Sequence, residues 1–237
     1  MRLRSLLAAL VFWPASVGAQ EPVDLELVLA LDASSSVSAF EFTLQKQGLA
    51  RAFRDPAVQK AILGLGPDGM AVAVLQWAGK GAQLDTLGWV HLRTEADADA
   101  FAARLTGIPR AVRGFTDIAG ALRKATAMID TNAFEGRRRT IDVSGDGTAD
   151  GENPARARDE AVARGIVVNG LVIHATEYDL GELAELDLFR QYAQDVTGGP
   201  GAFVMEAKDF RDFAEAMRRK LLREIAGNAF ARAAPKR

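Results

Sequence analysis

Asp32, Ser34 and Ser36 follow an apolar run and offer one carboxylate and two hydroxyl groups within five residues. The run, residues 25–31, is mostly Leu, Val and Ala without polar alternation, which is typical of a strand buried on both faces of a parallel sheet. In open α/β sheets, ligands bind just outside the carboxyl ends of the strands. Carboxylate and hydroxyl oxygens suit Mg²⁺, Mn²⁺ or Ca²⁺ rather than zinc or copper. Ser and Asp are also common helix N-caps, so this turn alone leaves both interpretations open.

Two further loops carry oxygen ligands at equivalent places in the chain. Thr116 stands just before an amphipathic segment, and Asp146 follows the apolar strand pattern of residues 140–144. Loops that leave the carboxyl edge of neighbouring parallel strands converge, so we expect these residues to meet the first turn. Two carboxylates about 5 Å apart repel by about 3 kcal/mol at an effective dielectric constant near 20, and a cation removes this cost.

The elements that must position these loops alternate between strand and helix along the whole chain. This alternation predicts a single doubly wound α/β domain, residues 20–227, with a mostly parallel sheet, helices on both faces and one antiparallel edge strand. We expect the edge strand at residues 86–92. The other strands are expected to begin near Leu25, Met70, Thr140, Ile166 and Ala202. Helices are expected at residues 40–53, 95–105, 118–129, 155–164, 183–193 and 209–225.

The two ends of the chain are expected to lie outside this domain. Arg2 and Arg4 precede a short apolar segment and the small residues 17–19, a pattern typical of a secretory signal peptide cleaved after Ala19. Residues 228–237 are expected to form a frayed tail. No later segment is apolar for long enough to span a membrane, so we expect an exported bacterial protein that is periplasmic or secreted.

Composition excludes several classes of function. The chain has no cysteine, which excludes disulfides, thiolate metal sites and cysteine nucleophiles. Its formal net charge of −2 gives no general basic field for nucleic acid. The motifs of serine hydrolases and of phosphate-binding loops are also missing.

The three loops together resemble the metal-ion-dependent adhesion site of von Willebrand factor type A (VWA) domains. The resemblance rests on residues 32–36, Thr116 and the pair Asp146-Gly147, in this order on an alternating α/β chain. It is sharper still with a bacterial family of exported VWA-like proteins of unknown function, to which residues 53–58, 134–138, 141–147 and 198–204 are similar.

The resemblance implies a role for each residue of the site. Ser34 and Ser36 would coordinate a divalent cation through their hydroxyls, Asp32 and Asp146 directly or through water, and Thr116 when the site is engaged. The expected cofactor is Mg²⁺, with Mn²⁺ or Ca²⁺ as alternatives. One departure is Gly145, because VWA domains commonly have threonine there and this chain loses that hydroxyl.

Three functions fit these residues. The first is a binding module in which the cation is presented to an acidic residue of an unidentified protein partner. The second is a phosphatase-like enzyme with Asp32 as nucleophile, but Ser34 stands where such enzymes need a second acid, so we expect no enzymatic activity. The third is a VWA scaffold with a purely structural metal, whose removal would unfold the protein.

Several other polar residues are expected to have structural roles. We expect Asp142 to be a buried, hydrogen-bonded residue, and Asp117 to complement the dipole of the helix that follows it. We expect the side chains of Asp150, Glu152 and His174 to be exposed to solvent or hydrogen bonded within the protein. Residues 137–139, a run of three arginines, are expected to form a solvated connection before a strand.

Overall fold

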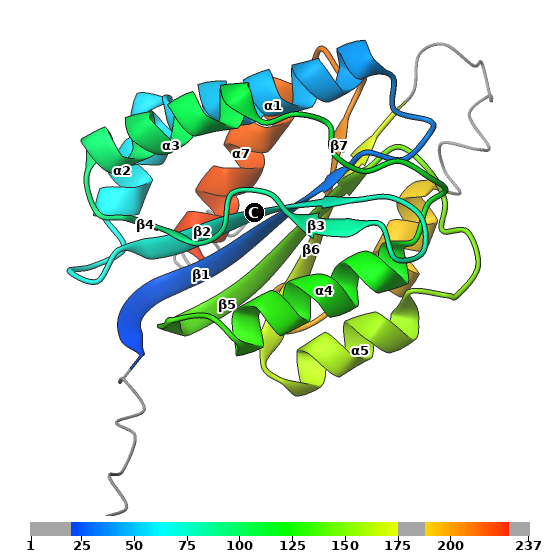
Figure 1. Cartoon of the computed structure of the whole chain (residues 1–237). Helices are drawn as coiled ribbons and strands as arrows, with labels where there is room; N and C mark the ends of the chain where they lie inside the picture. Colours follow the sequence, from blue (N-terminus) through cyan, green and yellow to red (C-terminus); the bar gives the residue numbers. More distant parts are fainter. Residues whose placement is uncertain (1–19, 175–187, 228–237) are drawn as a thin grey trace, which may run out of the picture.

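A computed structural model describes residues 20–174 and 188–227 of the chain. Its centre is a seven-stranded sheet in the order β3-β2-β1-β5-β6-β7, with β4 also paired to β2 (Figure 1). Five strands are parallel: β1 (Glu21–Asp32), β2 (Met70–Trp77), β5 (Phe134–Gly145), β6 (Ile166–Ile173) and β7 (Val204–Ala207). Their carboxyl ends lie together at the right of Figure 1.

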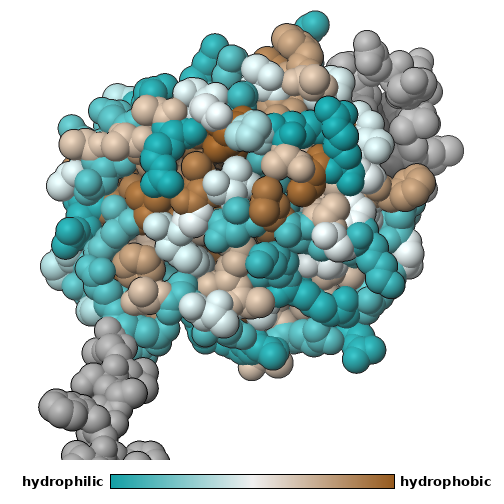
Figure 2. Space-filling view, in the orientation of Figure 1, coloured by the Kyte–Doolittle hydropathy of each residue, from teal (hydrophilic) through white to brown (hydrophobic). Residues whose placement is uncertain are grey.

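The antiparallel edge is made of two short strands rather than one. β3 (Gln83–Asp85) and β4 (Val90–Leu92) each pair with a different half of β2. Gly88, with φ +62°, lies in the turn between them. Figure 2 shows apolar side chains grouped near this edge, and Leu84 on β3 is among the exposed large hydrophobic residues. The predicted antiparallel edge is therefore confirmed, but its bounds were wrong: of residues 86–92 only 90–92 form a strand, and β3 lies before them.

Helices cover both faces of the sheet, as predicted (Figure 1). One face is packed against α1 (Ala39–Phe53), α2 (Pro56–Leu63), α3 (Glu95–Gly107) and α7 (Phe213–Ala226). The other is packed against α4 (Ile118–Asp130), α5 (Ala155–Ala163) and the π-helix η1 (Tyr192–Val196). The helix α2 was not expected; it begins at Pro56 in its first turn, with the Asp55 carboxylate accepting from the next two amides.

The strand β1 shows why an apolar run builds the centre of this fold. Its alternate residues Leu25 and Leu27 belong to the core beneath α1 and α7, whereas Val28 and Ala30 belong to the core beneath α4. Because both faces are buried, every position in this part of the strand must be apolar or satisfied by a buried partner. The apolar run ends where the strand ends, at Asp32, which is itself buried.

The prediction for residues 137–139 was wrong, because the three arginines are part of β5. Their guanidinium groups are held by the fold: Arg137 bridges Asp24 and Asp68, Arg138 donates to backbone carbonyls at the end of α7, and Arg139 donates to the carbonyl of Arg164.

Some predictions fall on residues that the structure does not describe. These are the signal peptide (residues 1–19), the tail (228–237) and the first half of the helix expected at residues 183–193. In the described part of the chain, no helix has both the length and the apolar character needed to cross a membrane.

Candidate metal site

The first loop of the site is a tight turn built on Asp32. The Asp32 carboxylate accepts a hydrogen bond from the Ser34 amide at 2.7 Å, which folds the chain back at the end of β1. Ser38, not the residues of this turn, caps α1, and it forms a reciprocal capping box with Glu41. The interpretation of Asp32, Ser34 and Ser36 as ordinary helix caps is therefore excluded.

A chain of side-chain hydrogen bonds joins this turn to the loop after β5. The Ser36 hydroxyl donates to Asp146 Oδ1 at 2.6 Å, and the hydroxyls of Ser34 and Ser36 lie 3.0 Å apart. Because Ser36 donates its only hydroxyl hydrogen to Asp146, it accepts from Ser34. Residues more than one hundred positions apart are thus in direct contact, as the topology predicted.

The third loop brings Thr116 to the same place. The Ser35 amide donates to the carbonyl of Gly114 at 2.8 Å, so the loop before α4 is tied directly to the serine turn. A Cβ atom built on Gly147 would lie 3.5 Å from Thr116 Oγ1 and 4.0 Å from Ser36 Oγ. The missing side chain of Gly147 therefore leaves a space that the two hydroxyls border. All five predicted residues lie around one point at the carboxyl edge of the sheet.

The two carboxylates are held under electrostatic strain. Asp32 is completely buried, and burial together with the charge of Asp146 raises its pKa to about 7. Burial is also the largest cause that raises the pKa of Asp146. The Oδ2 atoms of both side chains are buried and have no hydrogen-bond partner in the described structure. Such atoms are costly unless something satisfies them, and a cation would do so.

This set of donors fits a hard divalent cation. It consists of two carboxylates and three hydroxyls, and the described residues hold no cluster of three or more His, Cys, Asp or Glu that would suit another kind of metal centre. Oxygen ligands with few charges are typical of Mg²⁺ sites that keep several waters. Asp32, Ser34, Ser36, Thr116 and Asp146 would hold the ion, which would supply an open coordination position and a concentrated positive charge.

Two residues that sequence reasoning missed support the serine turn and Asp32. Arg110 donates to the backbone carbonyls of Ala33 and Ser34, at 2.9 and 2.6 Å, and so fixes the path of the turn. Burial lowers the pKa of this guanidinium, while Asp32 and Asp146 favour its charge. No local signal marks Arg110, because it lies in a loop far from the turn in sequence.

The second missed residue is Tyr192, which occupies the space beside Gly145. Tyr192 is completely buried, and its hydroxyl has no hydrogen-bond partner among the described residues. A Cβ atom on Gly145 would lie only 2.4 Å from the Tyr192 hydroxyl oxygen and 2.9 Å from Asp32 Oδ2. Tyr192 and the Asp32 carboxylate therefore leave no room for a side chain at position 145, which explains why this chain has glycine where VWA domains commonly have threonine.

We expect Gly145→Ala to destabilise the protein by about 1–3 kcal/mol, as overpacking of a dense core usually does. Tyr192→Phe removes the hydroxyl oxygen nearest to the new methyl group, so the double variant should regain part of this loss. Urea unfolding of the four proteins in the presence of chelator measures the coupling. Strictly additive effects of the two substitutions would contradict the contact described here.

Most of the remaining polar residues have the roles that the sequence indicated, but His174 is not fully satisfied, because its Nδ1 atom is buried without a hydrogen-bond partner in the described structure. Asp117 caps α4 by accepting from the Gly120 amide, and Asp142 is buried. The side chain of His174 lies 3.1 Å from Glu206. Asp150 is closer to the site than expected, because its carboxylate accepts from the Thr116 amide at 3.1 Å and so helps to orient that loop.

Comparisons with known proteins place the chain in a family. The family model described as "Protein of unknown function (DUF1194)" matches residues 22–229. The chain belongs to the DUF1194 family. No curated protein sequence matches this DUF1194 chain.

Solved structures show which fold this DUF1194 protein has. The pilus adhesin SpaC of Lactobacillus rhamnosus GG superposes with a TM-score of 0.62 and 16% identity, over 88% of this chain and 31% of SpaC. Proximal thread matrix protein 1 from the mussel byssus, with a zinc-occupied MIDAS motif, gives a TM-score of 0.62 and 16% identity, over 87% of this chain and 49% of that protein. The vWF domain of the pilus tip protein Mfa5 from Porphyromonas gingivalis gives 0.51 and 13%, over 84% and 96%.

These matches confirm a VWA-type fold. This chain spans about a third of SpaC and half of the byssus protein, so the comparison concerns one domain of each. At these identities the likeness shows the fold alone. The family model confirms the resemblance to a family of unknown function, and the resemblance to VWA domains is confirmed for the fold.

Proposed function

We propose that this protein is an exported binding module that presents a divalent cation to an acidic residue of a protein partner. The preferred cation in this proposal is Mg²⁺. The observation that carries the proposal is the pair of buried, unbonded carboxylate oxygens of Asp32 and Asp146. The hydroxyls of Ser34 and Ser36 are hydrogen bonded to each other beside them, and Ser36 also donates to Asp146. Mn²⁺ and Ca²⁺ have the same preference for oxygen ligands and remain alternatives.

The polar set is better suited to binding than to catalysis. A partner carboxylate would complete the coordination of the ion at a partly desolvated interface, where the charge of the ion dominates the contact. Ser34, which stands where an aspartate-based phosphatase needs its acid, can only donate or accept a hydrogen bond. We therefore propose no enzymatic role. An adhesin and a matrix protein among the structural neighbours fit this choice.

We expect partner binding to be lost in chelator and to return with Mg²⁺. In Ser34→Ala it should fall about tenfold or more, because even a residue that only hydrogen bonds to a metal ligand usually costs about tenfold or more in metal affinity when it is replaced. The measurement is a comparative pull-down from bacterial envelope extract, followed by titration of the captured partner. Ser35→Ala is the matched control in the same turn as Ser34, since the Ser35 hydroxyl donates to the carbonyl of Gly114 in the loop before α4 and does not touch Asp32 or Asp146.

Two outcomes would contradict this function. The same partners captured with and without chelator, and by Ser34→Ala as well as wild type, would exclude metal-mediated binding. Unfolding of the protein on metal removal would instead indicate that the ion serves only to hold the scaffold together.

A further inference from the structure

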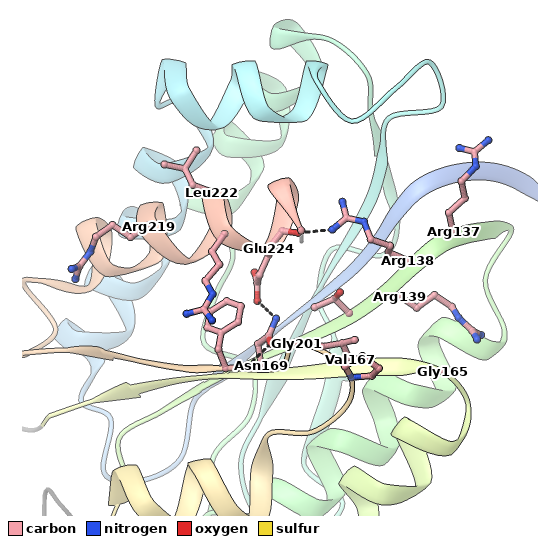
Figure 3. Close-up of a pocket in the computed structure, with 15 residues that line it drawn as sticks. Arg137, Arg138, Arg139, Gly165, Val167, Asn169, Gly201, Arg219, Leu222 and Glu224 are labelled. Atoms are coloured by element: carbon pink, nitrogen blue, oxygen red, sulfur yellow. Dashed lines mark hydrogen bonds between the residues drawn. The ribbon is translucent and has the colours of Figure 1, made fainter. Parts of the chain in front are cut away.

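A second hollow of the molecule lies at the opposite end of the sheet from the candidate metal site. It has a volume of about 770 Å³ and is bordered by the C-terminal half of α7, the N-terminal halves of β5 and β6, and the segment that leads into β7 (Figure 3). Asp146 follows the C-terminal end of β5, whereas Arg137, Arg138 and Arg139 of this pocket stand in its first half. Volumes of 300–1,000 Å³ are typical of sites for small molecules.

Five arginines line this pocket, although the chain as a whole carries a formal net charge of −2. Arg137 is paired with two aspartates, and Arg219 lies 4.0 Å from Glu215. The other three, Arg138, Arg139 and Arg223, have no carboxylate within 4.0 Å in the described structure. A group of guanidinium ions without counter-charges is the usual means of holding carboxylate or phosphate.

Arg223 shows this most clearly. Its guanidinium carbon lies 3.8 Å from the centre of the Phe203 ring. This stacking orients the guanidinium group and leaves its N–H donors free. No hydrogen bond or ion pair uses those donors in the described part of the chain. Arg139, by contrast, lies on the face of the sheet that α4 and α5 cover and donates to the carbonyl of Arg164, so it points away from the pocket (Figure 3).

The single acid in the pocket wall is already neutralised. Glu224 lies beneath the wall, with Oε1 2.7 Å from Lys220 Nζ and 2.9 Å from Asn169 Nδ2. Lys220 is buried between Glu224 and Asp142 and compensates the charge of Glu224, and Asp142 does not line the pocket. What the pocket presents to a ligand is therefore positive.

The rest of the wall is apolar. Val167 on β6, Leu222 on α7 and the ring of Phe203 form it, together with Pro200. Figure 3 shows the side chains of Val167 and Asn169 on the floor and those of Leu222 and Arg219 on α7 above them. A bare inorganic anion would satisfy the arginines and leave this apolar surface uncovered.

We propose that this pocket binds a small amphipathic anion, in which a carboxylate, phosphate or sulfonate group is attached to an apolar body. Arg223 holds the charged group, and the apolar body lies against Val167, Leu222 and Phe203. The site is separate from the candidate metal site and does not depend on a cation there.

Fluorescence titration of the full chain with 8-anilino-1-naphthalenesulfonate tests this proposal. N-phenyl-1-naphthylamine has the same aromatic body without the sulfonate, so it reports the contribution of the charge. We expect saturable binding of one sulfonate dye per chain, unaffected by chelator, and binding of the neutral dye about tenfold weaker or worse. Dodecanoate should displace the sulfonate dye, and inorganic phosphate should not do so at the same concentration.

Substitutions then locate the dye. Arg223→Gln should weaken binding of the sulfonate dye about tenfold, because a hydrogen bond to a charged group contributes about 1.5–3 kcal/mol and 1.4 kcal/mol is tenfold. Arg51→Gln is the matched control, since Arg51 is an exposed arginine on α1. Thermal unfolding of each variant shows that the fold is intact.

Three results would overturn the proposal. One is the absence of saturable binding by the full chain, which would also be the result if residues 228–237 fill the pocket. Another is equal affinity for the two dyes. The third is an equal effect of Arg223→Gln and Arg51→Gln.

Discussion

In the presence of Mg²⁺ at about one hundred times its dissociation constant, we expect the wild-type protein to gain about 2.7 kcal/mol of stability, a rise in Tm of about 5–10 °C. Asp32→Asn and Asp146→Asn should abolish this gain. Asparagine keeps the oxygen that accepts from the Ser34 amide or from the Ser36 hydroxyl and removes only the negative charge. Thermal unfolding with and without Mg²⁺ at pH 8 measures the effect.

The same substitutions should have the opposite effect without metal. Each removes one of two carboxylates that are buried and repel each other, so the metal-free variants should be at least as stable as metal-free wild type. Asp85→Asn is the matched control, because Asp85 also accepts from a backbone amide, that of Gly88, but on the edge strand β3. Equal Mg²⁺ stabilisation of wild type and both site variants would show that the ion binds elsewhere.

We expect Lys220→Met to lower the free energy of unfolding by about 3–5 kcal/mol, the usual cost of removing one partner from a buried ion pair. Lys220 is completely buried, with Nζ 2.6 Å from Asp142 Oδ1 and 2.7 Å from Glu224 Oε1. Burial and the neighbouring Glu224 already raise the pKa of Asp142 to about 7, and Lys220 acts against that rise. Without the lysine, two carboxylates would face each other in the core between α7 and β5.

Urea unfolding at pH 8 tests this prediction. The triple variant Lys220→Met, Asp142→Asn, Glu224→Gln carries no charge at this place and should recover most of the loss, whereas Lys60→Met on the exposed face of α2 should change little. Equal stability of the single and triple variants would contradict the assignment of the loss to uncompensated charge.

The sequence was sufficient for the fold because burial dictates its pattern directly. β1 and β6 are covered on both faces, so they read as continuous apolar runs. The edge was harder to predict, because β3 and β4 have only three residues each and an exposed side. Three residues are too few to reveal the alternation of apolar and polar residues that identifies a strand.

Residues of the candidate site could be predicted where they stand at or directly after the end of a strand. Asp32 and Asp146 stand where β1 and β5 end, and the topology alone brings such positions together. Arg110 and Tyr192 could not be found in this way. Arg110 acts through its long side chain on backbone carbonyls, and Tyr192 lies on a π-helix, whose period differs from the one that apolar patterns reveal.

Lys220 illustrates the same limit within a helix. It stands in a basic stretch of α7, four residues before Glu224, a spacing typical of ion pairs on exposed helix faces. The buried lysine is stable here because its ammonium group lies between the carboxylates of Asp142 on β5 and Glu224 on α7.

The most direct measurement of the central claim, a divalent cation held between Asp32 and Asp146, is the anomalous diffraction signal of crystals grown with Mn²⁺. We predict one strong peak within about 2.0–2.6 Å of oxygen atoms of this site, since Mn²⁺ shares the oxygen preference of Mg²⁺ and Ca²⁺. The Ser34 and Ser36 hydroxyls should be among the ligands. Well-ordered crystals with Mn²⁺ at millimolar concentration and no anomalous peak between the two aspartates would contradict the account.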